Sequence, residues 1–230
     1  MRIGGLIKTS LVDYPGKVAC SIFTIGCNFR CGYCHNPELV DPDRYIVPIP
    51  EELVFEFLEK RKDNLDGVAI SGGEPTLQPD LVDFIKHVKK LGLLVKLDSN
   101  GSNPDILEDL INQKLLDFIA MDVKGPIEKY TSIMGWPAGE KCKKSMELIL
   151  KSGIKHEFRT TIVKGYLEVE DFEEVGKLVQ GADQFALQHF RAIPEMVKTE
   201  DFKDAKTFSE REFERARKIM AKYVKKVIIH

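Results

Sequence analysis

Gly67-Val-Ala-Ile-Ser71, the turn Gly72-Gly-Glu-Pro75 and the run from Pro79 to Leu91 form the stretch that decides the fold. The first segment is short and apolar, which predicts a buried strand. The third has helical period and a proline in its first turn, where proline is tolerated. A second apolar segment, Leu93 to Leu97, follows. A strand, a helix and another strand in this order indicate parallel strands joined by a right-handed crossover.

The same alternation extends along most of the chain. We expect strands over 18–25, 67–71, 93–97, 118–122, 156–163 and 184–188, and helices over 50–62, 79–91, 104–114, 141–152, 169–180 and about 209–226. Ser209 and Glu212 form a capping-box pattern at the start of the last helix. The six strand–helix units are too few for a closed barrel of eight units, which takes ~250 residues. We therefore predict an α/β fold, a partial (β/α)6 TIM-like barrel that is open-sided with parallel strands, as a single domain over residues 1–230. An open doubly wound sheet is the rival.

Composition excludes several classes of protein. The 230 residues are 43% hydrophobic and 30% charged, which is typical of a globular chain with a substantial core. The net charge of -2 provides no positive field for nucleic acid or for an anionic membrane. The apolar run from Val18 to Cys27 is about half the ~20 residues of a membrane span, and charged residues interrupt the first 17. We expect a cytoplasmic protein with no nucleic-acid or membrane partner.

Three of the five cysteines lie in the loop Gly26-Cys-Asn-Phe-Arg-Cys-Gly-Tyr-Cys-His-Asn-Pro-Glu38. In a reducing compartment such a cluster indicates a metal site or redox chemistry. The residues alone leave open the buried stripe of a helix, a c-type haem attachment motif, a structural zinc site that includes His35, and an iron–sulfur cluster with only three thiolate ligands. We expect Cys20 and Cys142, which stand alone, to be structural thiols.

The spacing C-x-x-x-C-x-x-C, with an aromatic residue before the last cysteine, resembles the radical S-adenosylmethionine (SAM) superfamily. Asp13-Tyr-Pro-Gly16 and Cys34-His-Asn-Pro-Glu38 resemble motifs of the glycyl-radical-enzyme activases within it. The resemblance implies that Cys27, Cys31 and Cys34 hold a [4Fe-4S] cluster whose remaining iron binds SAM.

Other motifs lie at the expected C-terminal ends of strands, where a parallel barrel carries its active site. Glycines at 72 and 73 permit close approach of a ligand, and Glu74 can accept a hydrogen bond from an ammonium group. By resemblance, the SAM-binding set is Gly72, Gly73, Glu74, Asp98, Ser99, Asn100, Lys124, Arg159, Gln188 and His189. Resemblance also implies a monovalent-cation site formed by Asp98, Met121 and Asp122. No catalytic residue is expected beyond the cluster and SAM ligands.

The resemblance implies reductive cleavage of SAM and formation of a glycyl radical on a large partner enzyme, with flavodoxin or ferredoxin as electron donor. The compact length resembles the activating proteins of anaerobic ribonucleoside-triphosphate reductase, and pyruvate formate-lyase-activating enzyme is the alternative. Two other classes stay open. One is a radical SAM enzyme that acts on a small molecule, such as a deazaguanine synthase-like ring contraction, and the other is a zinc-binding interaction module.

Overall fold

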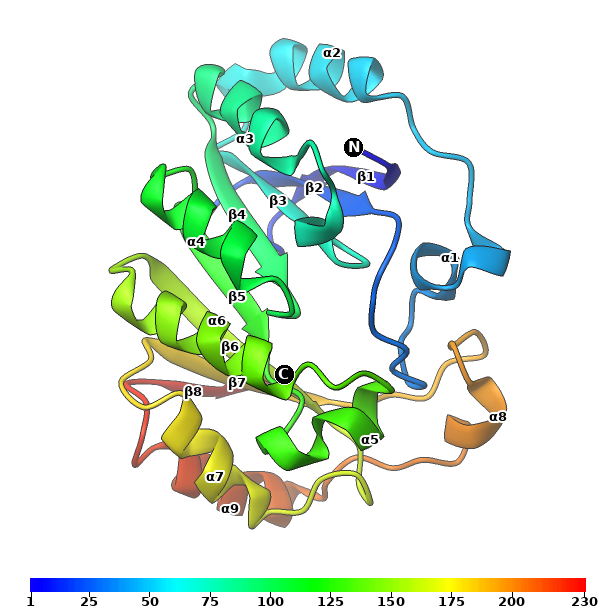
Figure 1. Ribbon diagram of the computed structural model, residues 1–230, viewed down its shortest axis with the longest axis vertical. Coiled ribbons are helices and arrows are strands. Elements are labelled where there is room, and N and C mark those ends of the chain that lie inside the picture. The colour runs from blue at the N-terminus through cyan, green and yellow to red at the C-terminus, as the bar shows by residue number, and fades with distance from the viewer. The chain divides into compact units, whose positions relative to one another are not determined.

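The computed structural model describes residues 1–230, which form two compact units (Figure 1). Unit 1 comprises residues 1–28, 36–99 and 105–119. Unit 2 comprises residues 29–35, 100–104 and 120–230. Strand β5 (Phe118–Asp122) begins in unit 1 and ends in unit 2.

Unit 1 contains four strands in chain order: β1 (Ile3–Ser10), β2 (Ala19–Thr24), β3 (Gly67–Gly72) and β4 (Leu94–Ser99). Strands β2, β3 and β4 are parallel, with Ile22 opposite Ile70 and Val68 opposite Val95. Strand β1 pairs antiparallel with β2. The helices are α1 (Pro37–Val40), α2 (Glu51–Arg61), α3 (Leu81–Lys90) and α4 (Pro104–Asn112), with short 3₁₀ turns η1 (Pro42–Arg44), η2 (Lys62–Asn64) and η3 (Pro75–Leu77).

Unit 2 contains three further parallel strands, β6 (Lys155–Ile162), β7 (Gln184–His189) and β8 (Val227–Ile229). Its helices are α5 (Tyr130–Met134), α6 (Gly139–Lys151), α7 (Asp171–Leu178), α8 (Thr199–Phe202) and α9 (Glu210–Met220), with the 3₁₀ turn η4 (Ile127–Lys129). Helices α7 and α9 lie side by side (Figure 1). Phe172 of α7 and Phe213 of α9 both contact Phe208, and all three rings are buried.

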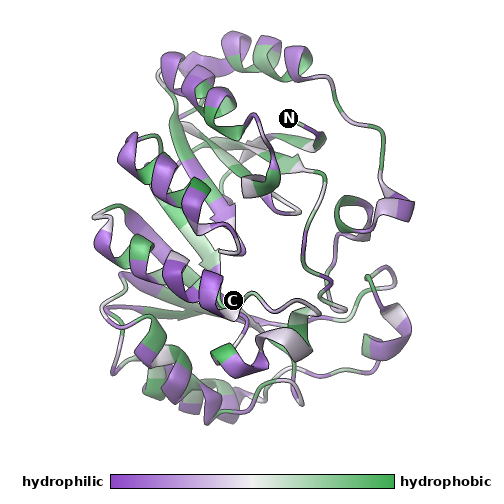
Figure 2. Cartoon of the chain, viewed as in Figure 1, coloured by the Kyte–Doolittle hydropathy of each residue, from purple (hydrophilic) through white to green (hydrophobic).

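The strands contribute fully buried apolar side chains to the core. Ile22, Ile70, Val95, Phe158 and Phe185 are fully buried. Figure 2 shows green segments within the strands and mixed green and purple faces on the helices, as expected where one helix face packs on a sheet and the other meets water. No helix is long and apolar enough to span a bilayer.

The six expected strand–helix units are present, each strand from β2 to β7 being followed by a long helix. Within each unit the strands follow one another in chain order without the reversal that a doubly wound sheet requires. The rival fold is therefore not supported.

Besides the short helices α1, α5 and α8, which were not predicted, three features differ from expectation. Strand β1 was not predicted, and it is antiparallel whereas all strands were expected to be parallel. The connection over residues 11–18 is too short for a crossover, so β1 and β2 can only form a hairpin. The last helix ends at Met220, not near 226. A turn over 221–226 lets residues 227–229 pair with β7 as β8, and Gly181 donates a backbone hydrogen bond to Tyr223 in that turn.

The capping box of α9 yields a testable prediction. The Ser209 hydroxyl accepts a hydrogen bond from the Glu212 backbone, and the Glu212 carboxylate accepts one from the Ser209 backbone. We expect Ser209→Ala to lower the free energy of unfolding by about 1 kcal/mol, measured by urea denaturation.

The hydrogen bond between Lys164 and Glu212 makes the stability of the protein depend on pH. A hydrogen bond from Lys164, reinforced by Ser209, lowers the pKa of Glu212 to about 2. Because this pKa is depressed in the folded state, the stabilisation is present above the ordinary glutamate pKa and is lost as pH falls toward 2. Glu212→Gln should therefore be less stable than the wild type at neutral pH, with a difference that shrinks below pH ~4. A difference that stays constant there contradicts the assignment.

Candidate active site

The turn after β3 is hydrogen-bonded to the start of the cysteine loop within unit 1. The backbone N–H of Gly73 donates to the carbonyl of Thr24 at 2.9 Å, and that of Glu74 donates to Gly26 at 2.8 Å. Gly26 in turn donates to Leu39 at the far end of the loop, at 2.7 Å. The motif predicted to bind SAM therefore lies directly beside the residue that precedes Cys27.

The Glu74 side chain is fully buried, and its position is set by hydrogen bonds. Its Oε1 atom accepts hydrogen bonds from the Thr76 backbone at 3.1 Å, the Thr76 hydroxyl at 2.6 Å and the Ser99 hydroxyl at 2.8 Å. A buried carboxylate is costly unless it is hydrogen-bonded in this way. The structure thus brings together two predicted site residues, Glu74 and Ser99, from the ends of β3 and β4.

The second part of the cysteine loop belongs to unit 2. The backbone of Cys34 donates to the carbonyl of Cys31 at 3.0 Å, which closes a turn between the two cysteines. Cys31 is buried. Cys27 belongs to unit 1, and no group of three or more His, Cys, Asp or Glu side chains forms a ready metal site. The joint role of the three cysteines stays a prediction.

The segment from Phe190 to Lys203 holds this part of the loop, a role that the sequence did not reveal. Val197 donates to the carbonyl of Cys34 at 3.2 Å, and Lys198 donates to that of Gly32 at 2.9 Å. The Tyr33 ring lies 6.3 Å from Phe190 and 5.8 Å from Phe202, centroid to centroid. Sequence analysis could have found only the aromatic residues of this long connection, because no local pattern encodes the backbone contacts.

His35 contacts the same segment. Its Nε2 atom is 2.8 Å from the carbonyl oxygen of Arg191. This hydrogen bond occupies Nε2 and leaves Nδ1 as the nitrogen that could ligate a metal, so the contact does not decide the zinc alternative.

Asp122 at the end of β5 is the centre of an ion network. Its Oδ1 atom lies 2.5 Å from Nε of Arg159, and its Oδ2 atom lies 3.0 Å from Nζ of Lys124. Burial favours the protonated acid, but the two cations outweigh burial and hold the pKa of Asp122 well below its usual range. Burial likewise opposes the charge of Lys124, and the Asp122 carboxylate more than offsets it, so the pKa of Lys124 is raised. Three predicted site residues are thus brought together as a charged unit.

The cysteine pair fits a metal cluster in its donor chemistry. None of the five cysteines forms a disulfide. Burial raises the pKa of the Cys31 thiol, while Lys124 acts in the opposite direction and favours the thiolate that binds metal. Two cysteines held in one turn supply two of the thiolates that an iron–sulfur cluster needs.

The end of β7 has a defined register. The Thr161 hydroxyl of β6 donates to Oε1 of Gln188 at 3.2 Å, and pairing of the two strands places Gln188 on the same face as Arg159. His189 lies on the opposite face, where its ring is 3.9 Å from that of Phe213 in α9. Of these two predicted SAM contacts, Gln188 shares the face of the ion network.

The remaining predicted residues have structural partners. The side-chain oxygen of Asn100 accepts a hydrogen bond from the Ser102 backbone, and the backbone carbonyl of Asn100 accepts one from the Cys142 thiol. Asp98 forms an ion pair with the buried Lys96. Because Asp98 and Asp122 are both ion-paired within the protein and Met121 is fully buried, the monovalent-cation site rests on resemblance alone.

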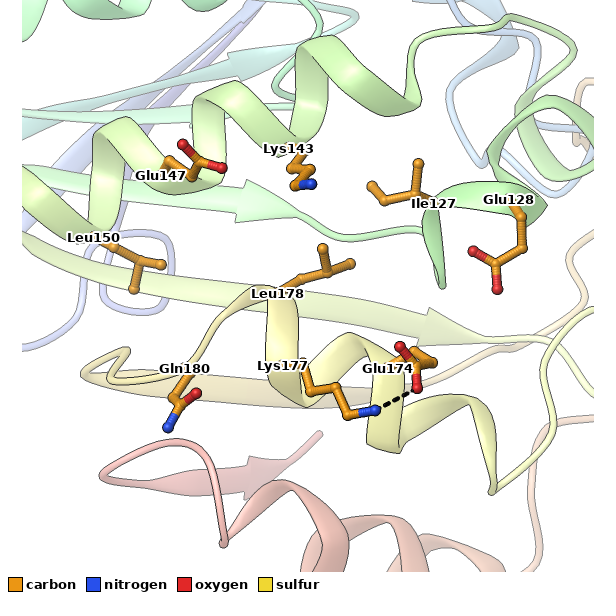
Figure 3. Close-up of a pocket in the computed structure, with 9 residues that line it drawn as sticks. All are labelled: Ile127, Glu128, Lys143, Glu147, Leu150, Glu174, Lys177, Leu178 and Gln180. Atoms are coloured by element: carbon orange, nitrogen blue, oxygen red, sulfur yellow. Dashed lines mark hydrogen bonds and ion pairs between the residues drawn. The ribbon is translucent and has the colours of Figure 1, made fainter.

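A pocket in unit 2 lies between α6 and α7 (Figure 3). Charged side chains of both signs line it, including Lys143 and Glu147 of α6 and the Glu174–Lys177 ion pair of α7. It contains none of the predicted site residues, so we assign it no part in the chemistry.

Comparison with known proteins identifies the family. The family model described as the radical SAM superfamily matches residues 21–179. The chain belongs to the radical SAM superfamily. It is 34% identical over 99% of its length to a Methanocaldococcus jannaschii protein, MJ1227, that is provisionally named a glycyl-radical enzyme activating enzyme, and it covers 95% of that protein. It is also 30% identical to the pyruvate formate-lyase-activating enzyme of Staphylococcus epidermidis, over 80% of this chain and 76% of that one. Within the superfamily it therefore belongs with the activating enzymes.

Solved structures show the same fold. Streptococcus suis SuiB bound to S-adenosylmethionine has a TM-score of 0.69 and 16% identity, over 90% of this chain and 51% of SuiB. A domain of a pyruvate-formate lyase-activating enzyme from Bacteroides vulgatus has a TM-score of 0.57 and 16% identity, over 71% of this chain and 98% of that domain. The predicted open partial barrel is confirmed. Membership makes this radical SAM protein an enzyme whose cofactors are a [4Fe-4S] cluster and SAM.

The contact between the β3 turn and the cysteine loop can be tested at Gly73. A Cβ atom there would lie 2.1 Å from the carbonyl oxygen of Gly26, a distance that real side chains do not tolerate. We expect Gly73→Ala to displace the start of the loop and to lower iron content severely after anaerobic reconstitution. Gly153→Ala is the control, because nothing lies near its added Cβ and only backbone strain is introduced. Equal iron content in the two variants would show that the contact is dispensable.

The ligand assignment can be tested with two cysteines that are both buried. Cys31→Ala should abolish the brown colour of the cluster and SAM cleavage together. Cys142→Ser should leave iron content nearly unchanged, because the Cys142 thiol packs in α6 against the carbonyl of Asn100. Iron content and 5′-deoxyadenosine are the measurements, and retention of both by Cys31→Ala rules out Cys31 as a ligand.

Proposed function

We propose that this enzyme generates a glycyl radical on a partner protein. The observation that carries the proposal is the full-length similarity to a protein provisionally named a glycyl-radical enzyme activating enzyme, at 34% identity over 99% of the chain. Similarity to named pyruvate formate-lyase-activating enzymes agrees with the proposal. The substrate in this proposal is the α-carbon of a glycine in a loop of the partner.

The cluster, when bound, supplies one electron that cleaves the sulfonium of SAM into methionine and a 5′-deoxyadenosyl radical. The chain's own residues bind and orient SAM and exclude water from it. In the proposal, the buried Glu74 faces the ammonium group of SAM and is held in place by Thr76 and Ser99. Lys124 and Arg159, held by Asp122, present a fixed pair of cations to the polar groups of SAM.

Two partner enzymes are candidates. The named relatives favour pyruvate formate-lyase, because two of them, from Clostridium pasteurianum and Staphylococcus epidermidis, carry its activating enzyme's name. The compact chain favours anaerobic ribonucleoside-triphosphate reductase, which we predicted from the sequence. A flavodoxin or a ferredoxin is the proposed electron donor in either case.

The proposal predicts a radical on a protein. The reconstituted enzyme, SAM, a reductant and each candidate partner are incubated without oxygen, and the partner radical is recorded by electron paramagnetic resonance. We expect a stable glycyl radical on one partner, in proportion to the 5′-deoxyadenosine formed. A partner variant with its radical-site glycine replaced by alanine is the control. SAM consumption that depends on a small metabolite, with no protein radical on either partner, would establish the small-molecule alternative.

A further inference from the structure

Strand β4 of unit 1 carries a buried lysine that the chemistry described above does not use. Lys96 lies between Val95 and Leu97, which are fully buried, and is itself only 4% exposed. A buried ammonium group is costly unless an opposite charge compensates it. The compensating group is the carboxylate of Asp98, two residues further along the same strand, with which Lys96 forms an ion pair.

The strand register shows how this pair is placed. Lys96 lies opposite Ala69 of β3, and Ala69 lies opposite Ser21 of β2. Alternation along β4 puts Asp98 on the same face as Lys96. These two are the only charged residues on this face of β2, β3 and β4. At the β2 end of the row, the Ser21 hydroxyl donates to Asp13 at 2.5 Å. The cation placed beside Asp98 on these strands is therefore the Lys96 ammonium.

This ion pair bears on the monovalent-cation site that the resemblance assigns to Asp98. An alkali-metal ion binds a carboxylate through its negative charge, and the Lys96 ammonium already compensates that charge. An ammonium group is itself a compact single positive charge that binds oxygen atoms. A second cation at the same carboxylate would lie close to the first and be repelled by it.

Asp122, the other carboxylate assigned to that ion, is also paired within its own unit. Its Oδ1 atom is bound by Arg159 and its Oδ2 atom by Lys124. Both carboxylates thus have side-chain cations as partners. The residues present therefore do not fit a free monovalent ion.

We propose that Lys96 is a built-in counter-ion, which takes the place of a free monovalent cation at Asp98, so that the enzyme binds and cleaves SAM without one. Because Lys96 is part of the chain, the cost of ordering this cation is met on folding and not when SAM binds. Lys96 is a positioning residue in this inference, since it acts through Asp98, a predicted SAM contact. The inference concerns the SAM site and does not depend on which partner the enzyme activates.

The test compares two salts at equal ionic strength with the reconstituted holoenzyme kept free of oxygen. Tetramethylammonium has no N–H group and is too large to replace the lysine ammonium, whereas potassium is small enough. The thermal unfolding midpoint is recorded without SAM, and SAM affinity is measured by calorimetry. We expect the wild type to show the same midpoint in both salts and SAM affinities within twofold of each other.

Lys96→Met keeps the length of the side chain and removes its charge, which leaves Asp98 free to take up potassium. We expect its unfolding midpoint to rise by about 4 °C as potassium replaces tetramethylammonium, and to level off as the site fills. Its SAM affinity should be about tenfold higher in potassium, the size of a typical coupling between two bound ligands.

Three further variants locate the response. Lys89→Met is the matched control in the same unit, because it breaks the partly exposed ion pair with Asp117, and it should not distinguish the two salts. Lys96→Arg keeps a cation on the strand and should likewise not respond. The double variant Lys96→Met, Asp98→Asn removes both charges and should lose the response.

Several outcomes would each overturn the inference. One is a wild type whose midpoint or SAM affinity rises with potassium as in Lys96→Met, because a free ion would then bind beside the lysine. Others are a Lys96→Met protein that folds but ignores potassium, one that does not fold even in potassium, and an equal response in Lys89→Met. Formation of a glycyl radical on a partner is a separate result, so failure here leaves the proposed function standing.

Discussion

The part of the site that lies in unit 1 depends on two backbone hydrogen bonds. The N–H groups of Gly73 and Glu74 donate them to the carbonyls of Thr24 and Gly26. They join the turn after β3 to the residue preceding Cys27, so the register of the strands sets where the cysteine loop begins. The approach is possible because residue 73 has no side chain, since a Cβ atom there would meet the Gly26 carbonyl at 2.1 Å. A shift of β3 by one residue would turn every side chain of that strand to the other face and break both bonds.

The long strands and helices could be predicted because their periodicity is imposed by burial. Strand β5 was predicted with the bounds it has, Phe118 to Asp122, since its apolar run is flanked by clear turns. Strand β1 was missed because it is half-exposed and contains two adjacent glycines, which weaken any strand pattern. Strand β8 has only three residues, and its pairing with β7 is a tertiary event that no local sequence encodes. The helices α1, α5 and α8 are likewise short, and their positions are set by tertiary contacts that no local sequence pattern encodes.

For the site, sequence reasoning found the residues but not their partners. Placement of Asp122 at a strand end followed from the alternation of strands and helices, whereas its simultaneous contacts with Arg159 and Lys124 required the structure. Arg159 was predicted by resemblance as a SAM contact, and in the structure it forms an ion pair with Asp122. An ion pair through Nε and a contact with SAM are not mutually exclusive for a guanidinium, which carries several N–H donors in a fixed plane.

The two units solve the same electrostatic problem by different means. Glu74 is a buried carboxylate whose charge is stabilised by neutral donors, while Asp122 is stabilised by two full cations. The two cations around Asp122 exceed its single negative charge, so the three groups together are net positive, and the two ion pairs fix their orientation. Because both arrangements are set by contacts within the protein, the cost of ordering these charged groups is met on folding and not when SAM binds.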